Sequence, residues 1–303
     1  MQAEPPSEGM PHVDGVTHRW VTANGLRFHV AEANPDGRDP VLLLHGWPQH
    51  WYEWRYLMPA LGEHHRVLAL DLRGFGWSDA PRDRYLKEDL AGDVLAVLDA
   101  LDIDSVKLVG HDWGGWIGFL LCLRAPERFH RYLALNVIHP WQERSAVLRH
   151  GWRFWYQQLI AAPVLGYNLH RSGSFVRFML RNGTGTLGTF DETALATFSG
   201  RLAEPHRARA AVQLYRSSNY RETLPILRGR YASSRLTVPT RLLFGSDDRA
   251  LPAVLTGGYE DHADDMSVEL VPGCGHFIAD ERPDLVAERA LAFFASEAAT
   301  VIE

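Results

Sequence analysis

The sequence predicts an α/β fold in which a mostly parallel central sheet carries helices on both faces and is interrupted once by a helical segment. Short apolar runs alternate with amphipathic helical patterns before Pro140, as expected when strands are buried on both faces. The alternation stops near Pro140 and resumes near Thr240. Because alternating strands and helices favour a covered parallel sheet, we expect one core that the inserted segment divides in two.

A hairpin opens the predicted core, and buried strands and helices follow it. Residues 19–23 and 26–31 read as strands joined at Asn24-Gly25, a dipeptide typical of two-residue hairpin turns. The further elements predicted before the interruption are strands 41–44, 67–70, 106–109 and 132–138 and helices 86–101 and 113–123. Residues 1–15, which are rich in Pro, Glu and Ser, are expected to form a loose tail.

The interrupting segment is predicted to be helical. Residues 140–235 contain amphipathic aromatic stretches at 152–160 and 208–215, separated by Gly-rich connections. The core then resumes with strands 240–244 and 267–271 and a helix over 284–294. We therefore expect a core formed by residues 1–139 and 236–303, with residues 140–235 as a helical cap.

Composition restricts the classes of partner and compartment. The 303 residues include 46% hydrophobic and 22% charged side chains, which suits a globular protein with a full core. The net charge of -6 and the lack of a basic cluster argue against binding to nucleic acid or anionic membranes. Two cysteines, Cys122 and Cys274, do not make a disulfide framework. With no signal-peptide pattern and no membrane-length apolar stretch, we expect a cytoplasmic protein that needs no cofactor or metal ion.

The turn after the strand at 106–109 predicts a nucleophile. Residues 110–114 read Gly-His-Asp-Trp-Gly and lead directly into an apolar helix, so Asp112 lies where unpaired N–H groups favour an ionised side chain. With Ser at its centre this element is a nucleophile elbow. A carboxylate needs no base to act as a nucleophile at pH 7. Its attack on an ester would give an over-reactive anhydride, whereas attack on saturated carbon gives a stable alkyl ester. Asp112 therefore predicts displacement on an epoxide or alkyl halide; the alternative is that it only caps the helix.

An ester on Asp112 would need a base to activate water, and two later turns supply candidates. His276 follows the strand predicted at 267–271, and Asp247 and Asp248 follow the strand at 240–244. Both turns fall at the carboxyl ends of strands, where open α/β sheets bind ligands. We assign His276 as the base and Asp248 as the carboxylate that orients it, with Asp247 as the alternative.

A third turn is predicted to bind negative charge. His45-Gly46-Trp47-Pro48 closes the strand at 41–44. The backbone N–H of Trp47, together with that of Trp113, can form an oxyanion hole for water attack on the ester carbon. We expect a cis peptide bond before Pro48, since such bonds occur in tight functional turns.

Four segments resemble α/β-hydrolase-fold epoxide hydrolases, the branch with an Asp nucleophile that is related to haloalkane dehalogenases. They are the elbow at 108–115, the turn at 45–48, the stretch Asp-Leu-Arg-Gly-Phe-Gly-Trp-Ser-Asp at 71–79 and Gly-Cys-Gly-His at 273–276. The likeness extends over roughly residues 20–300 in the same order of elements. It implies an α/β-hydrolase fold with an inserted cap.

The resemblance also implies two cap tyrosines that protonate the opening epoxide. A neutral phenol, whose ordinary pKa is about 10, suits that task. Tyr156 is followed by Gln and Tyr215 by Arg, as in the two family segments, so these are our candidates. Tyr220, five residues after Tyr215, is the alternative.

Two other functions stay open at this point. A haloalkane dehalogenase would use Trp113 as one halide donor, but many place Asn where this chain has Trp47. Dehalogenases that use a cap tryptophan instead leave three candidates, namely Trp141, Trp152 and Trp155. A non-catalytic ligand-binding protein of the same fold would usually keep a Ser elbow, which the Asp112, His276 and Asp248 set argues against.

The function that we predict is hydrolysis of an apolar epoxide to a vicinal diol through an alkyl ester on Asp112. Trp47, Trp113 and Phe277 are the predicted substrate contacts, and small apolar epoxide and water are the predicted partners. The sequence leaves a homodimer open and does not name the epoxide.

Overall fold

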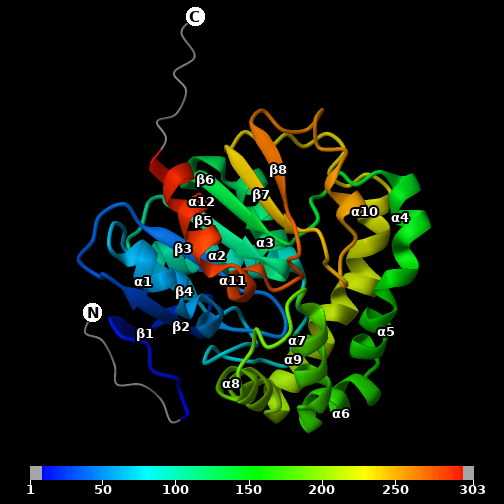
Figure 1. Cartoon of the computed structure of the whole chain (residues 1–303), viewed down its shortest axis with the longest axis horizontal. Helices are drawn as coiled ribbons and strands as arrows, with labels where there is room; N and C mark the ends of the chain where they lie inside the picture. Colours follow the sequence, from blue (N-terminus) through cyan, green and yellow to red (C-terminus); the bar gives the residue numbers. More distant parts are fainter. Residues whose placement is uncertain (1–8, 296–303) are drawn as a thin grey trace, which may run out of the picture.

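The described part of the chain, residues 9–295 of a computed structural model, contains one eight-stranded sheet with the order β1-β2-β4-β3-β5-β6-β7-β8 (Figure 1). β2 pairs antiparallel with both β1 and β4, whereas each pairing from β4 across to β8 is parallel. The fold is therefore the mostly parallel α/β architecture that the sequence predicts. The strands are β1 (Val16–Ala23), β2 (Leu26–Ala33), β3 (Val41–Leu44), β4 (Val67–Leu70), β5 (Val106–His111), β6 (Phe129–Leu135), β7 (Thr240–Gly245) and β8 (Met266–Val271).

Both faces of the sheet are covered, which explains why the central strands are continuously apolar. Alternate residues of β3 point to opposite faces: Leu42 and Leu44 join one apolar cluster, and Val41 and Leu43 join the other. The first cluster includes side chains of α2 and α3, and the second includes side chains of α1, α11 and α12. These helices are α1 (Leu57–Gly62), α2 (Lys87–Ala100), α3 (Asp112–Arg124), α11 (Ile278–Glu281) and α12 (Pro283–Ala295).

One strand boundary differs from the prediction in a way that matters below. β6 was expected over 132–138, but it spans Phe129–Leu135 and pairs with β5 from Phe129 onward. Asn136 has a φ of 39°, which lies in the left-handed region, so the chain leaves the sheet at this residue. Within the predicted tail, Met10 and Val13 pack against the core. Residues 1–8 and 296–303 lie outside the described residues.

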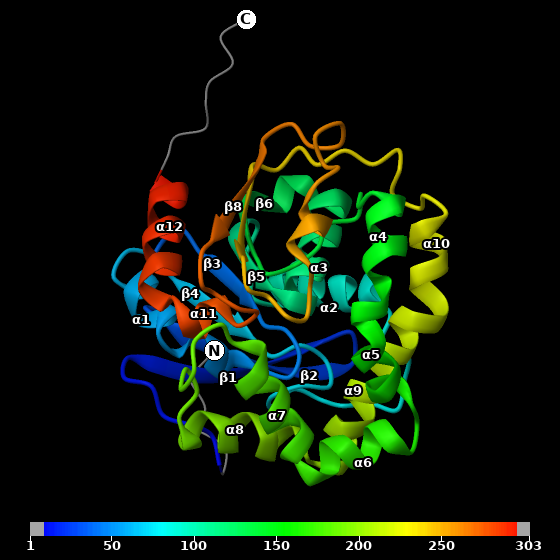
Figure 2. The same cartoon turned by 45° about the vertical axis from the view of Figure 1, so that its right-hand side comes forward.

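Helices fill the chain between β6 and β7. In Figures 1 and 2 the green to yellow helices gather on one side of the molecule, away from the helices that cover the sheet. We refer to residues 140–235 as the helical insertion. Its helices are α4 (Arg144–His150), α5 (Trp155–Ala161), α6 (Leu165–Ser172), α7 (Ser174–Gly183), α8 (Glu192–Leu202), α9 (Pro205–Ser217) and α10 (Thr223–Leu227), with a 3₁₀ turn at Gly151–Phe154 and a π-helical turn at Ser218–Glu222.

The junction of β5 and α3 is the most crowded turn of the core. Asp112, the first residue of α3, has a φ of 48°, a left-handed conformation that is uncommon for residues other than Gly. A Cβ atom on Gly114 would lie 2.1 Å from the carbonyl oxygen of Leu44, and one on Gly110 would lie 2.7 Å from the carbonyl oxygen of Gly114. These contacts are with backbone, which cannot rotate away, so Gly114 is required for the close approach of α3 to the end of β3, and Gly110 for the tight turn from β5 into α3.

We expect Gly114→Ala to lower the free energy of unfolding by about 1–3 kcal/mol or more, because the added methyl group meets backbone rather than a flexible side chain. Gly200→Ala is the matched control. Gly200 lies within α8 and a Cβ there would meet nothing within 4 Å, so this change should raise stability by about 0.5–1 kcal/mol. Denaturant unfolding of both variants checks the pair. A Gly114→Ala variant as stable as the parent would show that the turn is not the tight packing described here.

Candidate active site

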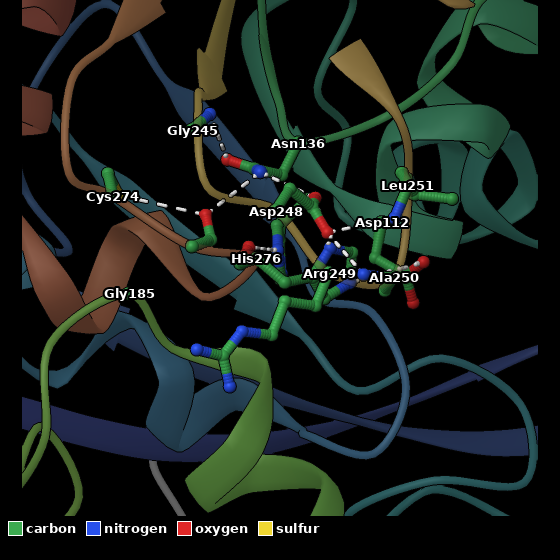
Figure 3. A network of polar contacts seen from close by, with 12 residues as sticks. Asp112, Asn136, Gly185, Gly245, Asp248, Arg249, Ala250, Leu251, Cys274 and His276 are labelled. Carbon is green, nitrogen blue, oxygen red and sulfur yellow. Dashed lines mark hydrogen bonds and ion pairs between the residues drawn. The ribbon is translucent and has the colours of Figure 1, made fainter. Parts of the chain in front are cut away.

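Three side chains from three strand ends meet at the carboxyl edge of the sheet (Figure 3). Asp112 follows β5, Asp248 follows β7 and His276 follows β8. The Nδ1 atom of His276 lies 2.8 Å from Oδ2 of Asp248. Its Nε2 atom lies 3.8 Å from Oδ1 of Asp112, which is beyond direct hydrogen-bonding distance. The imidazole therefore stands between two carboxylates and is bonded to one of them.

Asp248 is fixed by four hydrogen bonds. Its Oδ1 accepts the N–H groups of Ala250 at 2.7 Å and Leu251 at 2.8 Å, and its Oδ2 contacts His276 and accepts Nδ2 of Asn136 at 2.8 Å. Burial alone would raise the pKa of Asp248, but the charge and hydrogen bond of His276 bring it below its ordinary value. In turn, burial would lower the pKa of His276, and Asp248 raises it above its ordinary value.

The geometry distinguishes the two candidate carboxylates of this turn. Asp247 is exposed, and its Oδ1 accepts the hydroxyl of Ser246 at 2.8 Å. Asp248 is buried and contacts His276. Asp248, rather than Asp247, is thus the carboxylate in hydrogen-bonding contact with the imidazole.

Asp112 has one carboxylate oxygen bound and one directed toward the imidazole. The backbone N–H of Trp47 donates to Oδ2 at 2.8 Å. Burial raises the pKa of Asp112, while His276, His111 and the N–H groups of Trp47 and Trp113 oppose that rise. The peptide bond before Pro48 is cis, as expected from the sequence. The two N–H groups predicted as an oxyanion hole therefore converge on this carboxylate.

A cavity of about 320 Å³ adjoins Asp112 and extends between the core and the helical insertion. Trp113, Tyr156 and Tyr215 contribute to its wall. Tyr156 is 8% exposed and Tyr215 is 2% exposed. Burial, followed by the negative charge of Asp112, raises the pKa of both phenols above the ordinary value. Both are therefore protonated at neutral pH and can donate a proton.

The alternative tyrosine is placed differently. Tyr220 is 62% exposed, and its hydroxyl donates to Oε1 of Gln158 at 3.2 Å on the outside of the helical insertion. Two predicted substrate contacts, Trp47 and Phe277, do not line the cavity. The indole N–H of Trp47 donates to His170 at 3.0 Å, and the ring of Phe277 packs against Phe190 with centroids 5.4 Å apart.

Two polar groups beside the site were not predicted from the sequence. Asn136 donates to Asp248 and to the carbonyl oxygen of Gly275 at 3.0 Å. His111 lies against Oε1 of Glu53 at 2.8 Å through Nδ1 and contacts the carbonyl oxygen of His276 at 2.8 Å through Nε2. Burial would lower the pKa of His111, but the charge of Glu53 raises it to about 9. His111 immediately precedes Asp112, and its positive charge opposes the rise that burial causes in the pKa of that carboxyl group.

Within residues 9–295, no cluster of three or more His, Cys, Asp or Glu side chains could hold a metal ion. The same residues include no helix that is long and apolar enough to cross a bilayer.

We expect Asn136→Ala to lower the free energy of unfolding by about 1–3 kcal/mol, because it removes the donor to Asp248 and Gly275 and the acceptor of the Gly245 N–H. Asn136→Gly loses the same hydrogen bonds but tolerates the positive φ, so it separates the two effects. Thermal unfolding of both variants measures them. Equal stability of Asn136→Ala and the parent would exclude Asn136 as an anchor of Asp248.

Known proteins that resemble this chain were found by sequence and by structure. Residues 39–283 match the family model described as alpha/beta hydrolase fold. The chain is 29% identical to the soluble epoxide hydrolase of Corynebacterium sp. (strain C12), over 92% of this chain and 98% of that protein. It is also 29% identical to epoxide hydrolase 4 of Homo sapiens, over 89% of this chain and 76% of that one. The solved structure of epoxide hydrolase CorEH without ligand aligns with a TM-score of 0.76 at 29% identity and covers 92% of this chain and 99% of its own.

Proposed function

The chain belongs to the alpha/beta hydrolase fold family, and we propose that it is an epoxide hydrolase that converts an apolar epoxide and water into a vicinal diol. One observation carries the proposal: a single cavity contains the carboxylate of Asp112 and the protonated phenols of Tyr156 and Tyr215. A nucleophile and two acids are what ring opening of an epoxide needs. Likeness to two epoxide hydrolases over most of the chain supports the same substrate class.

In the first step Asp112 attacks a ring carbon. Because Oδ2 already accepts the N–H of Trp47, the free oxygen Oδ1 is the attacking atom. A C–O bond forms to the substrate as the C–O bond of the ring breaks. The ring oxygen takes a proton from Tyr156 or Tyr215, which prevents the release of a strongly basic alkoxide. The product of this step is a hydroxyalkyl ester of Asp112.

In the second step water attacks the ester carbon of Asp112. His276 removes the proton of the water through Nε2, and Asp248 stabilises the imidazolium that forms. Negative charge develops on Oδ2, where the N–H groups of Trp47 and Trp113 bind it. The tetrahedral intermediate collapses to the diol, whose oxygen regains a proton from His276, and the carboxyl group keeps one oxygen from water. The second proton of that water, released as the carboxyl group ionises, returns to the phenolate, so that Asp112 and the phenol are both restored.

Among the described residues, none of the three cap tryptophans considered as second halide donors for a haloalkane dehalogenase lines the cavity. Trp113 lines the cavity and could be the first. Among the three candidate tryptophans of the helical insertion, the indole N–H of Trp141 donates to the carbonyl oxygen of Tyr231 at 2.8 Å. Trp152 and Trp155 are 73% and 59% exposed. The acid pair therefore favours epoxide opening.

The proposed base predicts a trapped intermediate. Because His276 acts only in the second step, His276→Ala should gain the mass of one epoxide, measured by intact-protein mass spectrometry, and should release almost no diol. Asp112→Ala should gain no mass. In oxygen-18 water the first turnover of the parent should give unlabelled diol and a labelled Asp112. A fully labelled first-turnover diol would mean direct water attack and would remove Asp112 as the nucleophile.

Asp248→Asn should slow ester hydrolysis by on the order of 10²–10⁴-fold, with alkylation much less affected. Hydrolysis by the parent should increase as the pH rises through the pKa of His276, because only neutral imidazole accepts a proton. Asp248 raises that pKa, so Asp248→Asn should move the rise to lower pH. Asp247→Asn is the matched control and should behave as the parent. A defect in Asp247→Asn alone would transfer the orienting role to that residue.

The proposed acids are predicted to be partly redundant. Tyr156→Phe or Tyr215→Phe should each slow alkylation and leave measurable activity, because one phenol can still protonate the ring oxygen. The double variant should lose on the order of 10²–10⁴-fold in alkylation, measured by rapid mixing. Tyr220→Phe is the control with an exposed phenol and should alkylate at the parent rate. A double variant that opens epoxides as fast as the parent would refute the acid pair. Loss of halide release from an alkyl halide in Trp113→Phe would favour the dehalogenase function.

A further inference from the structure

A buried lysine lies in the cavity wall without a role in the steps above. Lys87 is the first residue of α2 in the core and is 1% exposed. Its ammonium group donates to the carbonyl oxygen of Leu214 at 2.7 Å and lies 2.8 Å from Oε2 of Glu222. It also stands over the ring of Trp113, 4.5 Å from the centroid. A buried charge is unfavourable unless it is well paired, so three specific contacts on one ammonium group call for an explanation.

Glu222 binds Lys87 at two points. Its Oε1 accepts the backbone N–H of Lys87 at 2.8 Å, which is one of the N–H groups that the start of α2 cannot satisfy within the helix. Its Oε2 forms the ion pair with the ammonium group. A carboxylate at this end of a helix is also favoured by the helix dipole. The π-helical turn that ends at Glu222 therefore joins the helical insertion to the first turn of a core helix.

The other two contacts of Lys87 lie next to the proposed catalytic groups. Leu214 immediately precedes Tyr215 in α9, and Trp113 immediately follows Asp112. The rings of Trp113 and Tyr215 in turn meet edge to face, with centroids 5.4 Å apart and an interplanar angle of 84°. The ammonium group thus contacts the backbone beside the acid and the ring beside the nucleophile.

We infer that Lys87, held by Glu222, is a positioning residue that fixes the phenol of Tyr215 relative to Asp112 for ring opening. This inference rests on the proposed function. Because Tyr215 acts only while the epoxide opens, a residue that positions Tyr215 should affect the first step and not the second. Ester hydrolysis depends on His276 and Asp248, whose side chains Lys87 does not contact, and on the backbone N–H groups of Trp47 and Trp113, whereas Lys87 meets only the ring of Trp113.

The test measures the two steps separately in Lys87→Met, which keeps a long apolar stem and removes the charge. Alkylation should slow by on the order of 10–100-fold, the scale expected when a reacting group is misplaced by about 1 Å. Hydrolysis of the preformed ester should be unchanged. In a Tyr215→Phe background the same change should have no further effect on alkylation, because the residue acts through that phenol. Additive losses in the double variant, or an equal loss in both steps, would overturn the inference.

Arg207→Met is the matched control for a merely structural defect. Arg207 also lies in α9, is 8% exposed and donates across the junction to the carbonyl oxygen of Ser78 at 3.1 Å, but it lies eight positions before Tyr215. It should lower thermal stability and leave the ratio of the two rates as in the parent. If Lys87→Met does not fold, Glu222→Gln replaces it, since the amide still accepts the N–H of Lys87 while the ion pair is lost. The expected selective loss is then smaller but of the same kind.

A readout without epoxide separates failure of this inference from failure of the proposed function. Amide hydrogen exchange over residues 213–222 should accelerate in Lys87→Met, while exchange over residues 205–209 stays as in the parent. Absence of diol formation by the parent protein would contradict the proposed function and leave the exchange result to decide on the contact. Unchanged exchange over residues 213–222 would overturn the inference whatever the substrate is.

Discussion

The site depends on one steric constraint, the strained left-handed conformation of Asp112 where β5 becomes α3. Such a conformation persists only where the surroundings enforce it. Here β3 lies against both sides of the turn: a Cβ on Gly46 would approach Cβ of Asp112 to 2.4 Å, and one on Gly114 would strike the carbonyl oxygen of Leu44. The same close approach brings the N–H of Trp47 to the carboxylate. Packing of two parallel neighbours thus sets both the orientation of the proposed nucleophile and the position of its proposed oxyanion donor.

Charges around this turn alternate in sign, which limits how far burial raises the pKa of Asp112. His276 stands before Asp112 and is paired with Asp248, and His111 stands behind it and is paired with Glu53. Burial alone raises the pKa of Asp112, and the two histidines lower it. The phenols on the far side of the cavity experience the opposite effect, because the charge of Asp112 adds to burial in keeping them protonated. The charge of the proposed nucleophile therefore helps to keep the proposed acids protonated.

The sequence predicts those features of the fold and the site that leave a pattern in neighbouring residues. Central strands are buried on both faces and leave continuous apolar runs, and the turns that follow them contain Asp112, Asp248 and His276, so all were found. Asn136 lies at the same edge of the sheet, but the strand was placed three residues too late and the residue was counted within it. Tyr156 and Tyr215 came only from family resemblance. Contacts between the core and the helical insertion join residues that are far apart in the sequence, as Lys87 and Glu222 are at a separation of 135 residues, so no local sequence pattern predicts them.

The identity of residue 87 is itself informative, because only two of the 31 basic residues of this chain are lysine. An arginine offers five N–H donors in a planar fork, whereas an ammonium group is compact and has three. The environment of Lys87 supplies one carbonyl oxygen, one carboxylate oxygen and one aromatic face, which matches three N–H groups. A guanidinium group there would bury donors without acceptors, which is unfavourable. A compact ammonium group can therefore contact three neighbours at once in a small volume. These neighbours are the backbone beside Tyr215, the carboxylate of Glu222 and the ring of Trp113.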